Sequence, residues 1–138
     1  MSATRREARE RALSLLYEAE SRGVAPDAVL PDLPLAPDPY TTELVEGVAA
    51  HLPRIDALIS TYARDWKLER MPAIDRAVLR LGAFELMGRP DVPTGVAISE
   101  AVALASEYST DESGRFVNGL MSRLSRELRP TDGDSVRP

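Results

Sequence analysis

The sequence contains no cysteine, one histidine (His51) and one lysine (Lys67). The missing thiols exclude disulfide bonds, thiolate metal sites and a nucleophilic cysteine. A single imidazole, with no nucleophile or second ligand near it in sequence, leaves no candidate for a serine–histidine triad or a histidine metal site. We therefore expect no cofactor, no bound metal and no enzymatic activity, and we expect His51 to lie partly exposed near a helix end.

Long hydrophobic runs are missing as well. No apolar stretch approaches the roughly 20 residues that span a bilayer, and the N-terminus lacks the apolar core of a signal peptide. The sequence therefore predicts a cytoplasmic protein with no membrane contact.

What the chain does contain is typical of one ordered globular domain. Its 138 residues are 43% hydrophobic and 28% charged, with a formal net charge of -5, which is the composition of a chain that buries a core. Of the 17 basic residues, Lys67 is the only lysine and the other 16 are arginines. Any contact with phosphate would therefore rely on guanidinium groups, which can bind it through two hydrogen bonds at once.

Hydrophobic periodicity indicates helices almost throughout and no alternating strand. We expect helices over residues 4–22, 39–52, 53–66, 72–88, 96–108 and about 112–129, with a proline-rich connector at 23–39 that has room for one short turn. Asp38 before Pro39, and Ser109 with Glu112, have the spacing of helix N-caps. Residues 72–88 carry apolar side chains on two faces, so this helix must be covered on both sides. The predicted fold is an all-α bundle around that central helix.

The start of the chain, "TRREARERALSLLY", places four arginines in seven consecutive positions. Residues at intervals of four form one ridge along the edge of the expected buried face, namely Arg5, Arg9, Leu13 and Tyr17. With Arg6 beside it, this ridge is a plausible surface for single-stranded RNA. The alternative is a solvated helix face, because Glu7 and Glu10 alternate with the arginines. The residues alone leave both interpretations open.

A second charged group lies on the central helix, in "IDRAVLRLGAFE". Arg76 and Arg80 share one face, and Asp75 and Glu85 lie near the edges of an apolar stripe. A mixed-charge strip beside apolar residues could bind a partner protein, or its charges could be solvated or paired within the molecule.

Four segments together resemble one family. "RREARERALSLLY", "IDRAVLRLGAFEL", "DVPTGVAISEAVALASEYS" and "GRFVNGLMSRL" occur in the order and spacing of the NusB family of transcription antitermination factors, over nearly the whole chain. The resemblance implies a compact bundle of about seven helices in two small subdomains that share the central helix. It also implies binding to the boxA element of ribosomal RNA transcripts together with the ribosomal protein NusE, in a complex with RNA polymerase that suppresses termination. Residues 1–129 would form the RNA-binding domain and 130–138 a mobile tail.

The resemblance also assigns roles to individual residues. RNA contacts would come from five of them: Arg5, Arg6, Arg9, Tyr17 and Glu112. The NusE-facing acid of the central helix would be Asp75, next to Arg76 and Arg80. In "FVNG" (116–119) we expect packing and a hydrogen bond between helices from Asn118. Glu7, Ser99 and Gly114 depart from the family pattern, and two of these departures remove phosphate contacts, so the isolated protein is expected to bind RNA weakly.

Two other functions stay open at this point. The chain could be a helical protein-interaction module that acts as a homodimer or accessory subunit without direct RNA binding. It could also be an accessory domain of a ribosomal RNA methyltransferase, although no methyl-donor fold follows it in the sequence.

Overall fold

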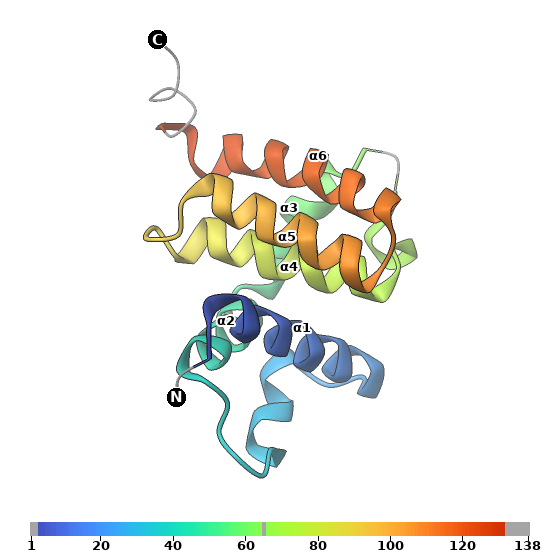
Figure 1. Cartoon of the computed structure of the whole chain (residues 1–138). Coiled ribbons are helices and arrows are strands. Elements are labelled where there is room, and N and C mark those ends of the chain that lie inside the picture. The colour runs from blue at the N-terminus through green and yellow to red at the C-terminus, as the bar shows by residue number, and fades with distance from the viewer. Residues whose placement is uncertain (1–2, 65, 132–138) are drawn as a thin grey trace.

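The computed structural model describes residues 3–64 and 66–131, and in these ranges the chain is all helical, as predicted. Six α-helices and two short 3-10 helices follow one another (Figure 1). They are α1 (Arg5–Arg22), η1 (Pro26–Asp32), α2 (Pro39–Ala50), α3 (Leu52–Tyr62), η2 (Leu68–Arg70), α4 (Ala73–Gly88), α5 (Thr94–Tyr108) and α6 (Asp111–Leu128). The expected tail at 130–138 falls almost entirely outside the described residues.

Short polar side chains and one glycine explain several helix ends. The Thr4 hydroxyl accepts a hydrogen bond from the Glu7 amide, and the Glu7 carboxylate accepts one from the Thr4 amide, which forms a complete capping box at α1. Glu7 therefore takes part in capping the start of the helix. Gly23 ends α1 with φ 68°, in the left-handed region that glycine adopts without strain. Asp38 caps α2 as predicted.

Two boundaries differ from the sequence prediction. The predicted cap of α6 is shifted by one residue, because Thr110 and not Ser109 accepts the hydrogen bond from the Ser113 amide. Helix α3 ends at Tyr62, although the apolar spacing continues to Trp66. The indole packs edge-on against Phe116 with ring centroids 5.2 Å apart, so its apolar position reflects a loop contact and not a longer helix.

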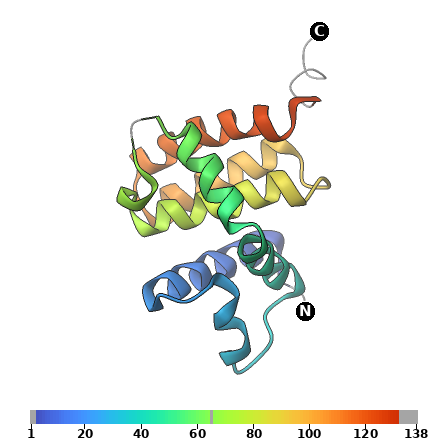
Figure 2. The same ribbon diagram turned by 180° about the vertical axis from the view of Figure 1, so that it is seen from behind.

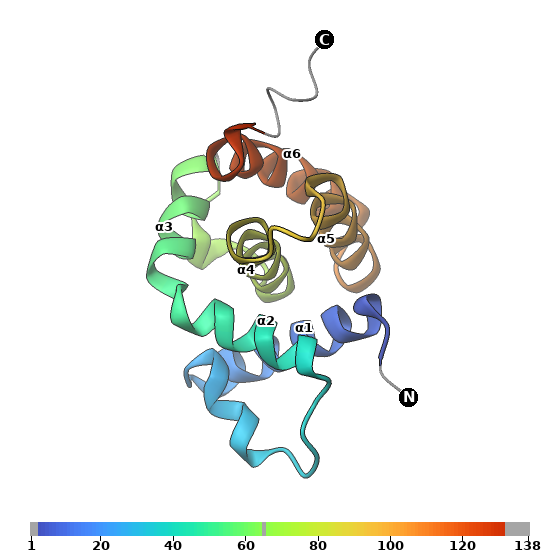
Figure 3. The same ribbon diagram turned by 90° about the vertical axis from the view of Figure 1, so that its left-hand side faces the viewer.

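Helix α4 lies at the centre and packs against all five other α-helices. Helices α1 and α2 lie on one side of it, and α3, α5 and α6 surround the rest (Figures 1, 2 and 3). Ten of its 16 residues are buried, which confirms that both faces are covered. At Gly82 the neighbouring helix comes so close that a Cβ would lie 2.6 Å from the Met121 Cε.

Arg129, just after α6, ties the end of the bundle back to its centre. Its guanidinium donates hydrogen bonds to four backbone carbonyls at the end of α4 and in the turn to α5, those of Glu85, Leu86, Arg89 and Val92. The carbonyls of Glu85 and Arg89 also accept a backbone amide, from Arg89 and Val92 respectively, and the arginine adds donors to all four at distances of 2.6–3.0 Å. Within 3–64 and 66–131, no helix is long and apolar enough to cross a membrane.

Candidate nucleic-acid interface

Arg9 does not lie on the surface. Only 4% of the residue is exposed, and its Nε lies 3.0 Å from both carboxylate oxygens of Glu85 on α4, itself 1% exposed. A further bond of 3.3 Å joins its Nη1 to Glu100 on α5. The predicted role of Arg9 as a phosphate contact is therefore wrong: α1 is anchored to the central helix by a buried ion pair, and the Arg9 side chain is not available to RNA.

Arg6 is accessible but already bonded. Its side chain is 60% exposed, and it holds Glu100 through two hydrogen bonds, with Nε to Oε1 at 3.2 Å. Glu100 therefore receives Arg6 and Arg9 together, and the hydrogen bond from Arg6 is the main reason why its pKa is lowered. A phosphate that binds Arg6 has to replace this carboxylate.

Arg5 lies over the ring of Tyr40, with its guanidinium carbon 3.8 Å from the ring centroid. Its side chain is 51% exposed, and its Nη2 is 3.9 Å from Asp91. Tyr40 itself is buried, and its hydroxyl donates to Glu85. Burial and this hydrogen bond raise the pKa of Tyr40 to about 12. The start of α1 thus rests on a fixed aromatic ring of α2.

The charged side chains around the start of α1, which we call the arginine cluster, carry equal numbers of positive and negative charges. Its four guanidinium groups belong to Arg5, Arg6, Arg9 and Arg89, and the four carboxylates that pair with them belong to Glu43, Glu85, Asp91 and Glu100. The N-terminal arginines therefore do not form the uncompensated positive strip that the sequence suggested. Two of them, Arg5 and Arg6, remain on the surface with exchangeable partners.

Tyr17 is exposed by 43% on α1, but it does not lie beside the arginines. Twelve residues separate it from Arg5, which corresponds to about 18 Å along a helix. Leu13, between them on the predicted ridge, is only 3% exposed. The continuous accessible row from Arg5 to Tyr17 is therefore interrupted, and stacking of a base on Tyr17 stays a prediction.

Arg76 and Arg80 are tethers within the molecule. Arg76 bonds to Glu20 of α1, with Nε to Oε2 at 3.1 Å, and to two backbone carbonyls before α4. Arg80 bonds to Glu20 and, through two hydrogen bonds of 2.8 and 2.9 Å, to Asp56 of α3. Their side chains are 13% and 17% exposed. The internal pairing that the sequence left open is therefore present, and nothing in the structure favours a partner contact of these two arginines.

Asp75 is fully buried, and neither of its carboxylate oxygens has a hydrogen-bond partner within the described residues. It cannot face NusE from this position, so the predicted partner contact at Asp75 is also wrong. Asn118 was expected to form a hydrogen bond between helices, but its side chain is exposed on α6 and makes no such bond within the described residues.

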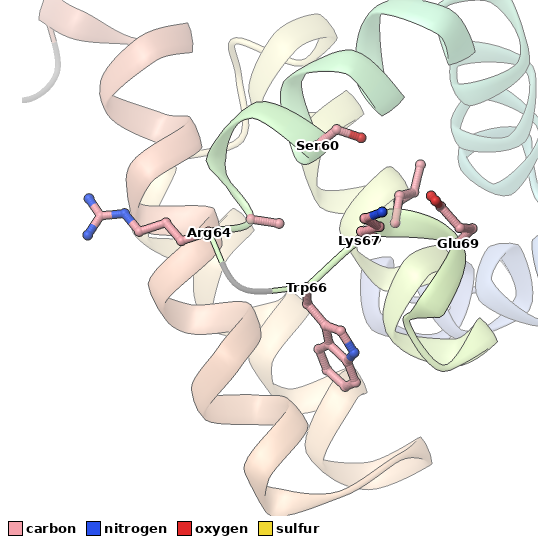
Figure 4. A pocket seen from close by; sticks show the side chains of 7 residues that line it. Ser60, Arg64, Trp66, Lys67 and Glu69 are labelled. Carbon is pink, nitrogen blue, oxygen red and sulfur yellow. The ribbon is translucent and has the colours of Figure 1, made fainter.

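Glu112 lies apart from the arginine cluster, in the first turn of α6. In Figure 1 α1 starts on the left of the molecule and α6 on the right. Glu112 lines a hollow with four other residues, Arg64, Trp66, Phe116 and Arg123. A second hollow of about 400 Å³ adjoins it at Trp66 and Arg64, where Lys67 and Glu69 flank the opening (Figure 4). The structure therefore does not bring the predicted RNA-binding residues together in one site.

The sequence did not reveal which residues pair with the N-terminal arginines or lie against them in the arginine cluster. Tyr40, Arg89 and Glu100 carried no signal, because each acts through a partner on another helix. Glu85 gave a partial signal, since a charged residue at the edge of a buried stripe requires a partner of opposite charge.

Comparisons with known proteins give a consistent result. A model described as the NusB family matches residues 6–126. The transcription antitermination protein NusB of Kineococcus radiotolerans is 53% identical over 133 residues, which cover 94% of this chain and 97% of that protein. The protein of the same name from Beutenbergia cavernae is 55% identical over 138 residues, with 90% of both chains covered.

Solved structures agree with these sequence matches. T. maritima NusB has a TM-score of 0.85 and 33% identity to this chain, covering 97% of it and 99% of that structure. A chain from a crystal structure of antitermination factors NusB and NusE in complex with dsRNA has a TM-score of 0.71 and 28% identity, covering 89% of this chain and 96% of that one.

Proposed function

Because the chain belongs to the NusB family, we propose that it is a transcription antitermination factor that binds boxA RNA of ribosomal RNA transcripts together with NusE. The main support for this proposal is the sequence identity of 53% and 55% to two NusB proteins over nearly the full length of the chain. The complex acts with RNA polymerase in the cytoplasm, and the chain contributes binding surfaces and no catalytic step.

The RNA contacts that the structure leaves available are Arg5 and Arg6. Both project from the first turns of a capped helix, and about half or more of each side chain is exposed. Both are also paired with carboxylates, so RNA has to break existing ion pairs. This exchange supports the expectation that the protein alone binds RNA weakly and that NusE supplies the missing affinity.

A titration of labelled boxA RNA, with and without NusE, tests this function. The double variant Arg5→Ala/Arg6→Ala should bind more weakly. Its salt exponent, which is the magnitude of the slope of log binding constant against log salt concentration, should fall by about 0.7 for each lost phosphate contact. Arg54, an exposed arginine of α3 without a partner in the described structure, provides a matched control. Failure of the wild-type protein to bind boxA RNA in either condition would remove the proposed function.

For NusE, we propose the surface where α1 meets α5. Tyr17 of α1 and Tyr108 at the end of α5 are each more than 40% exposed, and the Tyr108 hydroxyl donates to Glu10 of α1 at 2.8 Å. Exposed tyrosines are typical of protein interfaces, and acidic residues beside them suit a basic ribosomal protein better than they suit RNA. Since Asp75, Arg76 and Arg80 are internal, this surface is the best remaining candidate.

The variant Tyr17→Ala separates the two ligands. It should weaken NusE binding in calorimetry while the affinity of the isolated protein for RNA stays within about twofold, since Tyr17 lies about 18 Å along the helix from Arg5. Loss of RNA binding with normal NusE binding would instead support base stacking on Tyr17.

A further inference from the structure

A second arginine approaches Tyr40 from the other end of the cluster. Arg89 follows α4, and its guanidinium carbon lies 4.9 Å from the centroid of the Tyr40 ring over which Arg5 also lies. The Arg89 Nη2 is 2.9 Å from Asp91 Oδ2, and the Arg5 Nη2 is 3.9 Å from the same oxygen. One carboxylate oxygen thus lies between two guanidinium groups that come from different helices.

We propose that Arg5 and Arg89 form a clamp for one phosphodiester group of single-stranded RNA, and that Asp91 occupies this clamp when RNA is absent. The proposal rests on the RNA-binding function proposed above and adds Arg89 and Asp91 to it. A phosphate presents two anionic oxygens, which suit a pair of guanidinium groups better than one carboxylate oxygen does.

Tyr40 holds the clamp in shape. Its ring attracts both cations, and its buried hydroxyl is fixed by Glu85. Arg89 is held further by Glu43 of α2. The donors are therefore positioned before RNA arrives, so little conformational freedom is lost on binding.

Asp91 can leave the clamp at low cost. Its side chain is 56% exposed, so water and salt screen its carboxylate, and it is held by two hydrogen bonds of 3.0 and 2.9 Å from Arg89, whose side chain is 18% exposed. Glu100, which occupies Arg6 in the same way, differs in two respects. It is 16% exposed, and it is also bonded to the buried Arg9. Asp91 is therefore the carboxylate that RNA displaces most readily.

Replacement of Asp91 by a phosphate changes how strongly RNA binding depends on salt concentration. A phosphate that enters the clamp releases its condensed cations, but the displaced Asp91 takes up cations from solution. The wild-type protein therefore shows a smaller salt exponent than its arginines alone would give. An uncharged residue at position 91 restores the full exponent.

Fluorescence anisotropy of labelled boxA RNA, at several NaCl concentrations, tests the clamp with Asp91→Asn, Arg89→Gln and their combination. Asp91→Asn should bind about two- to fivefold more tightly, which is the effect of one exposed ion pair, with an exponent larger by about 0.7. Arg89→Gln should bind more weakly with a smaller exponent, and in its background Asp91→Asn should lose at least half of its effect. An RNA of scrambled sequence should show the same ratios, because phosphate contacts carry no sequence information.

Asp27→Asn in η1 and Arg54→Gln in α3 are the matched controls, since both residues are exposed and have no partner in the described structure. A gain from Asp27→Asn equal to that from Asp91→Asn would overturn the clamp, because it would show a general charge effect. Unchanged or weaker RNA binding by folded Asp91→Asn would overturn it too. A gain in affinity cannot arise from misfolding, so this variant stays informative even where Arg89→Gln is unstable.

The clamp and the proposed function fail in different ways. If wild-type protein binds boxA RNA and Arg5→Ala/Arg6→Ala binds it weakly, while changes at Arg89 and Asp91 have no effect, only the clamp is wrong. If Asp91→Asn strengthens the binding of NusE and not of RNA, the two arginines recognise a protein carboxylate and the clamp is again wrong. No binding of boxA RNA by wild type removes both.

Discussion

The buried pair of Arg9 and Glu85 allows the sharpest test of this fold. Replacing Arg9 by methionine keeps a side chain of similar length but leaves the Glu85 carboxylate, 1% exposed, with only the Tyr40 hydroxyl as a partner. Breaking a buried pair on one side costs about 3–5 kcal/mol. For a domain with a total stability of about 5–15 kcal/mol, this loss should lower the melting temperature by roughly 10–20 °C.

The assay is urea unfolding followed by Trp66 fluorescence and by circular dichroism. The matched variants are Glu85→Gln and the combination Arg9→Met/Glu85→Gln, which removes both charges. The combination should be more stable than Arg9→Met alone, because no uncompensated charge is then buried, and the coupling between the two sites should reach about 1–3 kcal/mol. The folded combination should also bind boxA RNA within about twofold of wild type, whereas an Arg6→Met variant binds it more weakly, since only exposed arginines contribute phosphate contacts.

Two results would refute this reasoning. One is an Arg9→Met variant that unfolds at the wild-type urea concentration. The other is a folded Arg9→Met/Glu85→Gln protein that loses RNA affinity as strongly as Arg6→Met, because Arg9 would then reach the RNA in spite of its burial.

Substitutions at three other residues, Tyr40, Gly47 and Arg129, should lower the stability of the fold measurably. Burial and the hydrogen bond to Glu85 raise the pKa of Tyr40 from 10.0 to about 12 on folding, so its stabilising effect is complete below pH 10 and is lost as the pH rises to 12. Urea midpoints of the wild type should fall more steeply between these pH values than those of Tyr40→Phe, and equal slopes would contradict the raised pKa. Gly47→Ala should lose about 1–3 kcal/mol of unfolding free energy, since a Cβ would collide with the Phe84 ring; wild-type stability in urea would disprove this. Arg129→Ala should lower stability by about 1–3 kcal/mol, because the carbonyls of Leu86 and Val92 lose their donor. Arg129→Lys should recover less than half of this loss in thermal melts.

The helices and their order could be predicted because the signals are local. Apolar spacing and the caps at Asp38 and Gly23 involve residues close in sequence, and the two apolar faces of residues 72–88 correctly indicated a central helix. Trp66 shows the limit of periodicity. An apolar residue in register looks the same whether it continues a helix or packs from a loop.

The candidate site was less predictable because it is built from distant partners. Arg9 and Glu85 are 76 residues apart, and Arg6 and Glu100 are 94 residues apart. Spacing on one helix places Arg5, Arg6 and Arg9 close together, but it does not show which of them faces a carboxylate of another helix. Family resemblance has the same limit, since it transfers a role without the burial that allows or forbids it.

The reach of Arg129 across the bundle has a consequence for how the chain folds. The carbonyls it satisfies at the end of α4 lie about 40 residues earlier in the chain, so α4 leaves the ribosome well before its C-terminal end can be capped. Until α6 is made, the carbonyls of Leu86 and Val92 lack this donor, and the C-terminal end of the central helix is only partly capped. Completion of the core thus waits for a contact of long sequence separation, and we expect its formation to be a late event in folding.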